Sequence, residues 1–544
     1  MQDGPPIRRD RNTASGLSLL VLPGVYAAAA LWSRAAGGPA WLWFNLDPAY
    51  FYLLDALNLI NLTAPAIVYH PGIPVTWLGA LVLKAAHPLA GADALTGMVL
   101  ADPEFHLRLI GGVFVALNAL ALLAVGVAGR RACRSLTAAW FLQSAPFLSM
   151  VILKHSYHVK PEALLLATTL LLIAAAMLTL EPGLVERHRR RFAVGFGVIA
   201  GFGVAVKITA FPVFVLPLFV VGGPRWMIVY GASALASLVV FMLPAAGAAD
   251  VFVAWMTKVA LGTGAYGGGP AGFVDWTQYP ASVLKLFKRP VFHVPFVLAA
   301  LTLAWAWRRR RERPLDVPAL RLLAGVVAAQ LAQALIVAKQ PNAMYMIPSL
   351  VLSAPAVVVL WRLLAPAVAG RAAGRADGPR WLGRGFAVLL AAVLAAGAFG
   401  TVRLAGELAA DAKPALAADN DRFRACARVY AYAASSPSFA LLLGDYVAGG
   451  RFGEQLSQVI PANDFWLEHW WDQSRVAFRD ARGPADMAAA LGRYPCVMVR
   501  GSHWFVTGPL LKKMAPAQTF DAACSTRDEI IHVRGAGCDG KPRP

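Results

Sequence analysis

Residues 109–134 read LIGGVFVALNALALLAVGVAGRRACR, an apolar run that ends in a cluster of arginines. A helix needs about 20 mainly apolar residues to cross the hydrocarbon core of a bilayer, and this run has that length. Arginine and lysine gather in the cytoplasmic loops of membrane proteins. The stretch therefore predicts a transmembrane helix that ends on the cytoplasmic side.

Comparable apolar runs recur along residues 1–403 and predict about eleven spans in a mainly α, polytopic membrane protein. The expected spans are 17–32, 109–129, 136–153, 161–180, 192–207, 208–222, 227–246, 291–307, 317–338, 344–364 and 385–403.

The arginine clusters between these runs predict the orientation of the chain. The first run follows Arg8, Arg9 and Arg11 and has no small-residue cleavage site, so we expect an uncleaved span with its N-terminus in the cytoplasm. Alternation from there places all the later clusters inside. These clusters are 130–134, 187–191, Arg225, 308–313 and 371–384. An odd number of spans then puts residues 404–544 outside the cytoplasm.

Composition indicates the same class of protein. Of the 544 residues, 58% are hydrophobic and 15% are charged, whereas soluble domains average about 45–50% apolar and about 25% charged residues. A water-soluble enzyme, a disordered chain and a coiled coil are therefore excluded. The net charge of +20 lies almost wholly in residues 1–403, because residues 404–544 carry 16 basic and 15 acidic side chains. This distribution reflects topology, so no nucleic-acid partner is expected.

Two external loops are long, 33–108 and 247–290. The first is too long to be a simple connector. Its apolar stretches 48–62 and 73–86 are interrupted by polar residues, which favours amphipathic helices that lie in the membrane interface.

Residues 404–544 have the mixed composition of a folded domain, and alternating patterns predict a small α/β domain. The runs that resemble strands are 439–443, 497–500 and 530–533, and those that resemble helices are 421–434 and 485–491.

Four of the five cysteines also lie in this last domain, at positions 426, 496, 524 and 538. They indicate up to two disulfides and hence an oxidising compartment. Three connectivities are possible. We expect Cys426–Cys496 and Cys524–Cys538, since each pairing closes a local loop.

Side chains that could carry chemistry gather on the expected external side, and ionisable groups at membrane depth are costly enough to indicate function. The candidates are Asp47, Tyr50, His70 and Lys84 in the first loop, and His155, His158, Glu162, Lys207, Lys285, Lys288, Arg289, Lys339 and Tyr345 further along the chain. A carboxylate just outside the first span can deprotonate an acceptor hydroxyl, and nearby cations can stabilise a departing phosphate. The pattern therefore favours glycosyl transfer from a lipid phosphate.

Each of these residues also has a structural interpretation. Asp47 could cap the helix that follows, with Pro48 at its first position, and capping is compatible with catalysis. Asp55, in the same loop, fits a solvated helix face. Lys84 and Lys207 could extend toward lipid headgroups.

The remaining clusters leave similar alternatives open. His155 and His158 could bind a metal ion, contact substrate, or do neither. Lys285, Lys288 and Arg289 could hold anionic lipid alone.

Six elements of this sequence occur in a distinctive order. They are Asp47, the segment 69–74 (YHPGIP) that leads to Lys84, Arg108, 160–162 (KPE), 203–207 (GVAVK) and 339–348 (KQPNAMYMIP). In this order they resemble the GT-C superfamily of integral membrane glycosyltransferases, close to glycosyltransferase family 39. That family includes protein O-mannosyltransferases and bacterial lipid A aminoarabinose transferases. The resemblance covers about residues 17–403.

This sequence departs from the family pattern at three positions. Pro48 stands where the family often has Glu, Gly72 replaces the second Pro of a His-Pro-Pro segment, and Val206 replaces the Thr before Lys207. These departures bear on the identity of the sugar and of the acceptor.

The resemblance implies an external active site and a polyprenyl-phosphate-linked sugar donor in a bacterial plasma membrane. It implies that Asp47 is the base, that Glu162 orients substrate or a bound divalent cation, and that Tyr345 lines the cavity. Lys84, Lys207 and the 285–289 cluster would contact the lipid phosphate. The acceptor would be an envelope lipid, polysaccharide or protein, and no metal ligand set is assigned.

Two other classes of function remain as alternatives. A transporter would have ionisable groups at span centres and broken helices in paired halves. A non-catalytic scaffold would bind a partner through residues 404–544, and substitution of Asp47 would then be silent.

The topology is tested by cysteine-accessibility labelling. Single cysteines within 404–544 should react with an impermeant reagent added outside the cell. Those within 308–313 should react only after permeabilisation. Labelling of both segments from the same side would contradict the eleven-span arrangement.

Overall fold

The computed structural model describes residues 16–42, 49–69, 72–309, 316–371, 378–418, 420–431, 433–469, 476–502, 519–525 and 529–541. These residues form two compact units. Unit 1 lies within Met1–Trp32, Val68–Val75 and Gly111–Leu404. Unit 2 lies within Ser33–Ile67, Thr76–Ile110 and Ala405–Pro544, so segments of the first long loop belong to the same unit as the C-terminal residues.

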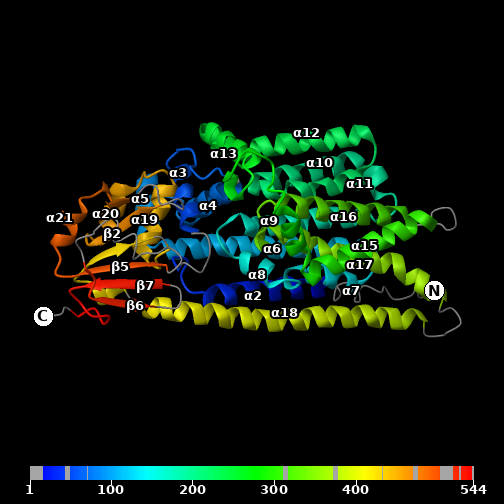
Figure 1. Ribbon diagram of the computed structural model, residues 1–544. Helices are drawn as coiled ribbons and strands as arrows, with labels where there is room; N and C mark the ends of the chain where they lie inside the picture. Colours follow the sequence, from blue (N-terminus) through cyan, green and yellow to red (C-terminus); the bar gives the residue numbers. More distant parts are fainter. Residues whose placement is uncertain are drawn as a thin grey trace, which may run out of the picture. The chain divides into compact units, whose positions relative to one another are not determined.

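Unit 1 is helical (Figure 1). Its helices are η1 (Ser18–Leu20), most of α2 (Val21–Ala36), most of α6 (Pro103–Cys133), α7 (Leu136–Gln143), η3 (Ala145–Phe147), α8 (Met150–His155), α9 (Pro161–Leu178), α10 (Leu184–Val206), η4 (Ile208–Val215), α11 (Leu216–Val221), α12 (Pro224–Met242), η5 (Leu243–Ala248), α13 (Ala249–Leu261), η6 (Ala265–Gly267), α14 (Tyr279–Phe287), α15 (Pro290–Arg309), α16 (Val317–Val337), η7 (Ala343–Met346), α17 (Ile347–Arg371) and most of α18 (Gly378–Ala417).

Eight helical segments of the described residues are long and apolar enough to cross a membrane. The three other expected spans coincide with helices that miss this criterion. Residues 136–155 are broken into α7, η3 and α8, α10 begins with arginines, and η4–α11 is short. The chain is an integral, polytopic, mainly α membrane protein, as the sequence predicted.

Small residues set the packing of α10. An added Cβ at Gly197 would lie 2.5 Å from Ser233 Cβ, and one at Gly201 would lie 2.3 Å from the carbonyl oxygen of Ala234. Both contacts are with α12, which runs beside α10 (Figure 1). This Gly-x-x-x-Gly spacing lets two membrane helices approach closely, where lipid supplies no hydrophobic force between them.

Unit 2 combines short helices with a sheet. Its elements are α3 (Ala49–Ile60), most of α4 (Ile73–Ala86), α5 (Ala92–Ala101), the start of α6, the end of α18, η8 (Asn420–Phe423), β1 (Ala427–Tyr430), α19 (Pro437–Val447), α20 (Gly453–Val459), β2 (Asp464–His469), β3 (Val476–Asp480), β4 (Gly483–Pro484), α21 (Met487–Gly492), β5 (Val497–Ser502), β6 (Ala522–Ser525) and β7 (Glu529–Arg534). The helices α3 and α4 coincide with the two amphipathic stretches predicted in the first loop.

The sheet has the strand order β4-β3-β2-β1-β5-β7-β6. Strand β1 is parallel to β2 and β5, and the remaining neighbours are antiparallel. Alternate residues such as Val429 and Val499 pack into a core with Leu491 of α21, while Trp466 meets Phe439 and thus α19. Because successive strand residues face opposite ways, α21 and α19 cover opposite faces. The predicted small α/β domain is confirmed.

Two local predictions in this domain are wrong. Residues 439–443, expected to be a strand, lie in α19, and residues 421–434, expected to be a helix, contain strand β1. The predicted strands at 497–500 and 530–533 lie in β5 and β7, and the helix at 485–491 overlaps α21.

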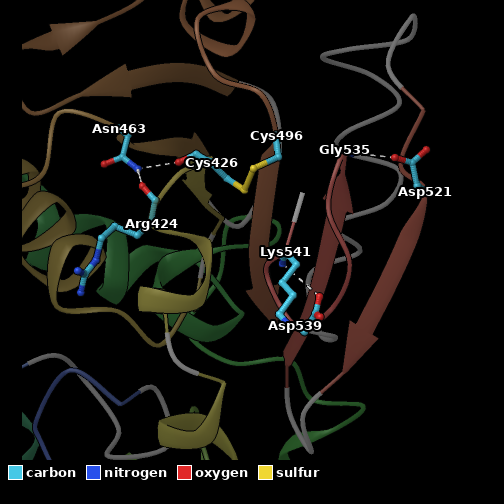
Figure 2. The surroundings of a disulfide bond; sticks show 8 residues. All are labelled: Arg424, Cys426, Asn463, Cys496, Asp521, Gly535, Asp539 and Lys541. Atoms are coloured by element: carbon cyan, nitrogen blue, oxygen red, sulfur yellow. Dashed lines mark hydrogen bonds between the residues drawn. A yellow bond between two sulfur atoms is a disulfide. The ribbon is translucent and has the colours of Figure 1, made fainter. Parts of the chain in front are cut away.

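Both expected disulfides are confirmed, as Cys426–Cys496 and Cys524–Cys538. Cys426 and Cys496 stand directly before the parallel strands β1 and β5, so their bridge joins the strand starts (Figure 2). Beside it, the Asn463 side chain donates to the carbonyl oxygens of Arg424 (3.1 Å) and Cys426 (2.6 Å) (Figure 2). The beginnings of β1, β2 and β5 are therefore tied together.

Replacing both Cys426 and Cys496 by serine should destabilise this domain by about 4 kcal/mol, because the bridge closes a long loop in the unfolded chain. Unfolding in denaturant, followed by tryptophan fluorescence, measures the loss. In the wild-type protein, non-reducing mass mapping should find a free thiol at Cys133. Free thiols at the other four positions would contradict both bridges.

Candidate functional site

The start of α9 places Glu162 inside unit 1. Lys160 has an extended backbone (φ −160°, ψ 166°) directly before the helix, and Pro161 occupies the first helical turn. Proline is pre-organised for that position, since its fixed φ suits the helix and it lacks an N–H that would go unbonded. Glu162 follows in the first turn, where the helix dipole stabilises a carboxylate, and it is 1% exposed.

The end of α10 brings Lys207 to Glu162. A Cβ on Gly203 would lie 2.2 Å from Phe214 Cζ and 2.8 Å from Thr168 Cγ2, so glycine lets α10 lie against η4 and α9. One turn later Lys207 ends the helix and is 4% exposed. Its ammonium group donates to Glu162 Oε1 in a buried ion pair.

Further groups surround this pair. The Lys207 ammonium lies 4.6 Å from the centre of the Tyr345 ring, within the range of a cation–π contact. Lys160 is 1% exposed, and its ammonium group and the buried His155 ring are among the groups whose electrostatics act on Glu162. Two buried ammonium groups and an imidazole thus share the surroundings of Glu162.

Polar contacts fix the segment between α8 and α9. Asn118 of α6 donates to the carbonyl oxygens of Ser156 (3.3 Å) and Ala163 (3.1 Å), on both sides of Lys160. Gly111, also on α6, would carry its Cβ only 2.9 Å from the Tyr157 carbonyl oxygen. The segment therefore follows α6 closely, and the position of Lys160 depends on that contact.

Two other residues hold the surroundings of Lys207. Gly72 has a left-handed backbone (φ +70°), and its N–H donates to the Val206 carbonyl oxygen at 3.2 Å. The Gln333 amide on α16 donates to the carbonyl oxygens of Thr209 (2.9 Å) and Tyr345 (2.8 Å). Lys207 and Tyr345 are thereby held by elements that are distant in sequence.

The arrangement suits an anion better than a metal ion. The neighbours of Glu162 are themselves cations, which disfavours a divalent cation at this carboxylate. The described residues contain no group of three or more His, Cys, Asp or Glu that could hold a metal. Buried ammonium groups next to a buried carboxylate can bind a phosphate as point charges.

Comparison with known proteins finds no matching family model and no matching curated protein. Among solved structures, the chain is similar to ArnT. The matched structure is the crystal structure of ArnT from Cupriavidus metallidurans bound to undecaprenyl phosphate, with a TM-score of 0.48 and 14% sequence identity. The match covers 94% of this chain and 97% of that chain.

Of the residues predicted from sequence, Glu162, Lys207, Tyr345 and His155 come together in unit 1. His158 is buried, and its ring lies 4.6 Å from that of Tyr157. Lys207 is therefore not a lysine that extends to the headgroups.

The other predicted residues have different surroundings. Lys339 donates to the Val259 (2.6 Å) and Ala260 (3.2 Å) carbonyl oxygens at the end of α13. Lys285 and Lys288 are exposed and Arg289 is half-buried. In unit 2, Lys84 is exposed and donates to the Ala90 carbonyl oxygen at 2.8 Å. Asp47 and His70 lie outside the described residues.

The expectation that Asp55 occupies a solvated face is wrong. It is completely buried in unit 2 and accepts hydrogen bonds from Asn58 Nδ2 (2.9 Å) and from the N–H groups of Ala66 (2.8 Å) and Ile67 (3.0 Å). Burial raises the pKa of Asp55, and these hydrogen bonds oppose the rise. Asp55 therefore organises the turn that follows α3.

Several structurally important residues were missed by the sequence analysis. Gln333 and Asn118 could have been found, because an amide within an apolar span needs a partner there. Gly72 had been noted as a departure from the His-Pro-Pro pattern. Glu104, whose carboxylate accepts the N–H groups of Ala40 and Trp41 and the hydroxyl of Tyr50, gives a weaker indication, since a carboxylate in the first turn of a helix is common.

We expect Lys207→Met to destabilise the protein by about 3–5 kcal/mol, because it leaves the Glu162 carboxylate buried without its ammonium partner. Adding Glu162→Gln to this variant should restore most of the stability. Thermal unfolding of the protein in detergent measures both changes, with Lys288→Met as an exposed-lysine control. A Lys207→Met protein as stable as wild type would argue against the buried pair.

Proposed function

We propose that this protein is a glycosyltransferase that moves a sugar from a polyprenyl-phosphate donor to an acceptor in the cell envelope. The reaction would take place on the external side of a bacterial plasma membrane, with residues 404–544 outside. The acceptor is a lipid, a polysaccharide or a protein. The proposal combines the GT-C resemblance of the sequence with the cluster around Glu162.

The observation that carries the proposal is the buried cluster of Lys207, Lys160 and His155 around Glu162. Burying charge is costly unless it is compensated. The ammonium groups of Lys207 and Lys160 are both buried close to this carboxylate, and lysine ammonium groups bind phosphate as point charges. The ammonium groups would then stabilise the phosphate as it departs from the sugar.

Glu162 and Tyr345 have supporting roles in this proposal. The carboxylate of Glu162 accepts a hydrogen bond from the Lys207 ammonium group and directs it into the cluster. The Tyr345 ring lies against the same ammonium group and limits the access of water to it. A lysine held in this way needs little reorganisation when the phosphate gains charge, which is how preorganised groups lower a barrier.

The proposed chemistry is a displacement at the anomeric carbon of the sugar. An acceptor hydroxyl forms a bond to this carbon while the bond from the carbon to the phosphate oxygen breaks. The hydroxyl proton passes to Asp47, and the electron pair of the broken bond leaves with the polyprenyl phosphate. A general base within reach of the hydroxyl contributes about 10²–10⁴-fold to such a step.

Asp47→Asn is the sharpest test of this assignment. Asn caps a helix about as well as Asp, so the variant should keep its yield and thermal stability. It removes the proton-accepting charge, and transfer should fall by about 10²–10⁴-fold. The assay would use radiolabelled lipid-linked sugars extracted from the source membranes as donor, and envelopes of a deletion strain as acceptor. Unimpaired transfer by the variant would remove Asp47 from the mechanism.

A further inference from the structure

Gln333 of α16 joins two short segments of unit 1 that meet around Lys207. Its side-chain amide donates to the Thr209 carbonyl oxygen at 2.9 Å and to the Tyr345 carbonyl oxygen at 2.8 Å. The side chain of Gln333 is fully buried. Both partners are carbonyl oxygens, so only the NH₂ group of the amide can face them, and both of its hydrogen atoms are used. Gln333 therefore holds the backbone at two places at once.

Prolines remove the usual donors of these two carbonyl oxygens. Thr209 lies in η4 and Tyr345 in η7, and a carbonyl in a 3₁₀ turn accepts from the N–H three residues later. The residues at those positions are Pro212 and Pro348, which have no N–H. Losing a backbone donor inside a membrane is costly unless a side chain from a neighbouring helix supplies the hydrogen bond. Gln333 supplies it at both places.

The two segments that Gln333 joins carry Lys207 and the aromatic ring that lies against it. Thr209 belongs to the first turn after Lys207, which is closed by the hydrogen bond from the Ala210 N–H to the Lys207 carbonyl oxygen at 3.0 Å. The Tyr345 ring centre lies 4.6 Å from the Lys207 ammonium group. The position of the ammonium group relative to the ring thus depends on the bridge through Gln333.

We propose that Gln333 is a positioning residue for phosphate binding: by bridging the Thr209 and Tyr345 carbonyl oxygens, it holds the Lys207 ammonium group where the phosphate of the lipid-linked donor binds. This inference rests on the proposed function, in which Lys207 contacts that phosphate. The attraction between two charges falls as their separation grows. At an effective dielectric constant of about 20, an increase from about 3 to about 4 Å costs about 10-fold in affinity.

The test variant is Gln333→Met, which has a similar length and removes both hydrogen bonds. Its matched control is Gln330→Met. Gln330 lies one turn earlier on α16 and is also fully buried, and its amide donates to the Ser349 carbonyl oxygen (2.9 Å) and to Ser353 Oγ (3.3 Å). Both of these partners belong to α17. The two variants thus lose the same type of contact from the same span.

We expect both variants to lower the thermal stability of the full-length protein in detergent by a similar amount. Only Gln333→Met should weaken the binding of undecaprenyl phosphate, by about 10-fold, because only this variant releases Lys207. Equilibrium binding of the radiolabelled lipid measures the affinity. Amide hydrogen exchange at residues 207–215 and 343–347 should be faster in Gln333→Met than in Gln330→Met.

A second background shows whether the effect passes through Lys207. The double variant Lys207→Met with Glu162→Gln has no ammonium group to position. Adding Gln333→Met to it should therefore not weaken the remaining binding of undecaprenyl phosphate any further. A further loss of about 10-fold in this background would show that Gln333 acts on binding by another route, and would overturn the positioning role.

The comparison of the two glutamine variants also separates this inference from the proposed function. Wild-type affinity in Gln333→Met, or equal losses of affinity in Gln333→Met and Gln330→Met, would overturn the positioning role and leave the proposed function standing. If the wild-type protein binds no undecaprenyl phosphate, the proposed function itself fails. Hydrogen exchange then decides whether Gln333 holds the two segments, and exchange that is no faster than in the control would overturn that as well.

Discussion

The buried ion pair between Glu162 and Lys207 is the interaction on which the organisation of unit 1 depends. Taking two charges out of water is costly, and their attraction offsets that cost only when geometry brings them into contact. Here Glu162 begins α9 and Lys207 ends α10, so the contact requires both helix ends to meet at the same depth. Gly203 makes the approach possible, because a larger residue would collide with Thr168 and Phe214.

The departures from the family pattern follow from the same constraint. At the fourth position of the Tyr-His-Pro-Gly segment, Gly72 adopts φ +70° and donates its N–H to the Val206 carbonyl oxygen. Proline could do neither, since its φ is fixed near −65° and it has no N–H. Val206 is fully buried beside Lys207, where a side chain without a hydroxyl needs no hydrogen-bond partner. The two departures therefore concern how the chain packs next to Lys207.

Much of the fold could be predicted because membrane spans and disulfides leave strong local patterns. The run at 317–338 became α16 almost residue for residue, and the local cysteine pairs were correct. Residues 439–443 were misassigned because a short apolar run fits a buried helix as well as a strand. There α19 packs against both the sheet, through Phe439, and α3, through Gly444, so apolar residues occur all round it. The contact between α19 and α3 joins residues that are hundreds of positions apart in the sequence, and no local sequence pattern indicates it.

The candidate site was predictable to a similar extent. Glu162, Lys207 and Tyr345 were found because ionisable and aromatic residues near apolar spans are conspicuous, but their grouping needed the fold. The acidic residues of the first loop show why residue type alone does not distinguish a structural carboxylate from a catalytic one. Asp55, Asp102 and Glu104 each accept backbone N–H groups.

A carboxylate with such partners already uses lone pairs to hold the backbone, so fewer remain for a substrate hydroxyl. It serves structure and is a poor base. Glu162 differs, because its carboxylate accepts from the Lys207 ammonium group. A carboxylate of the first loop that acts as a base must keep a lone pair available for the proton of the acceptor hydroxyl. By this reasoning the acids that organise the first loop and the acid proposed to react in it are different residues.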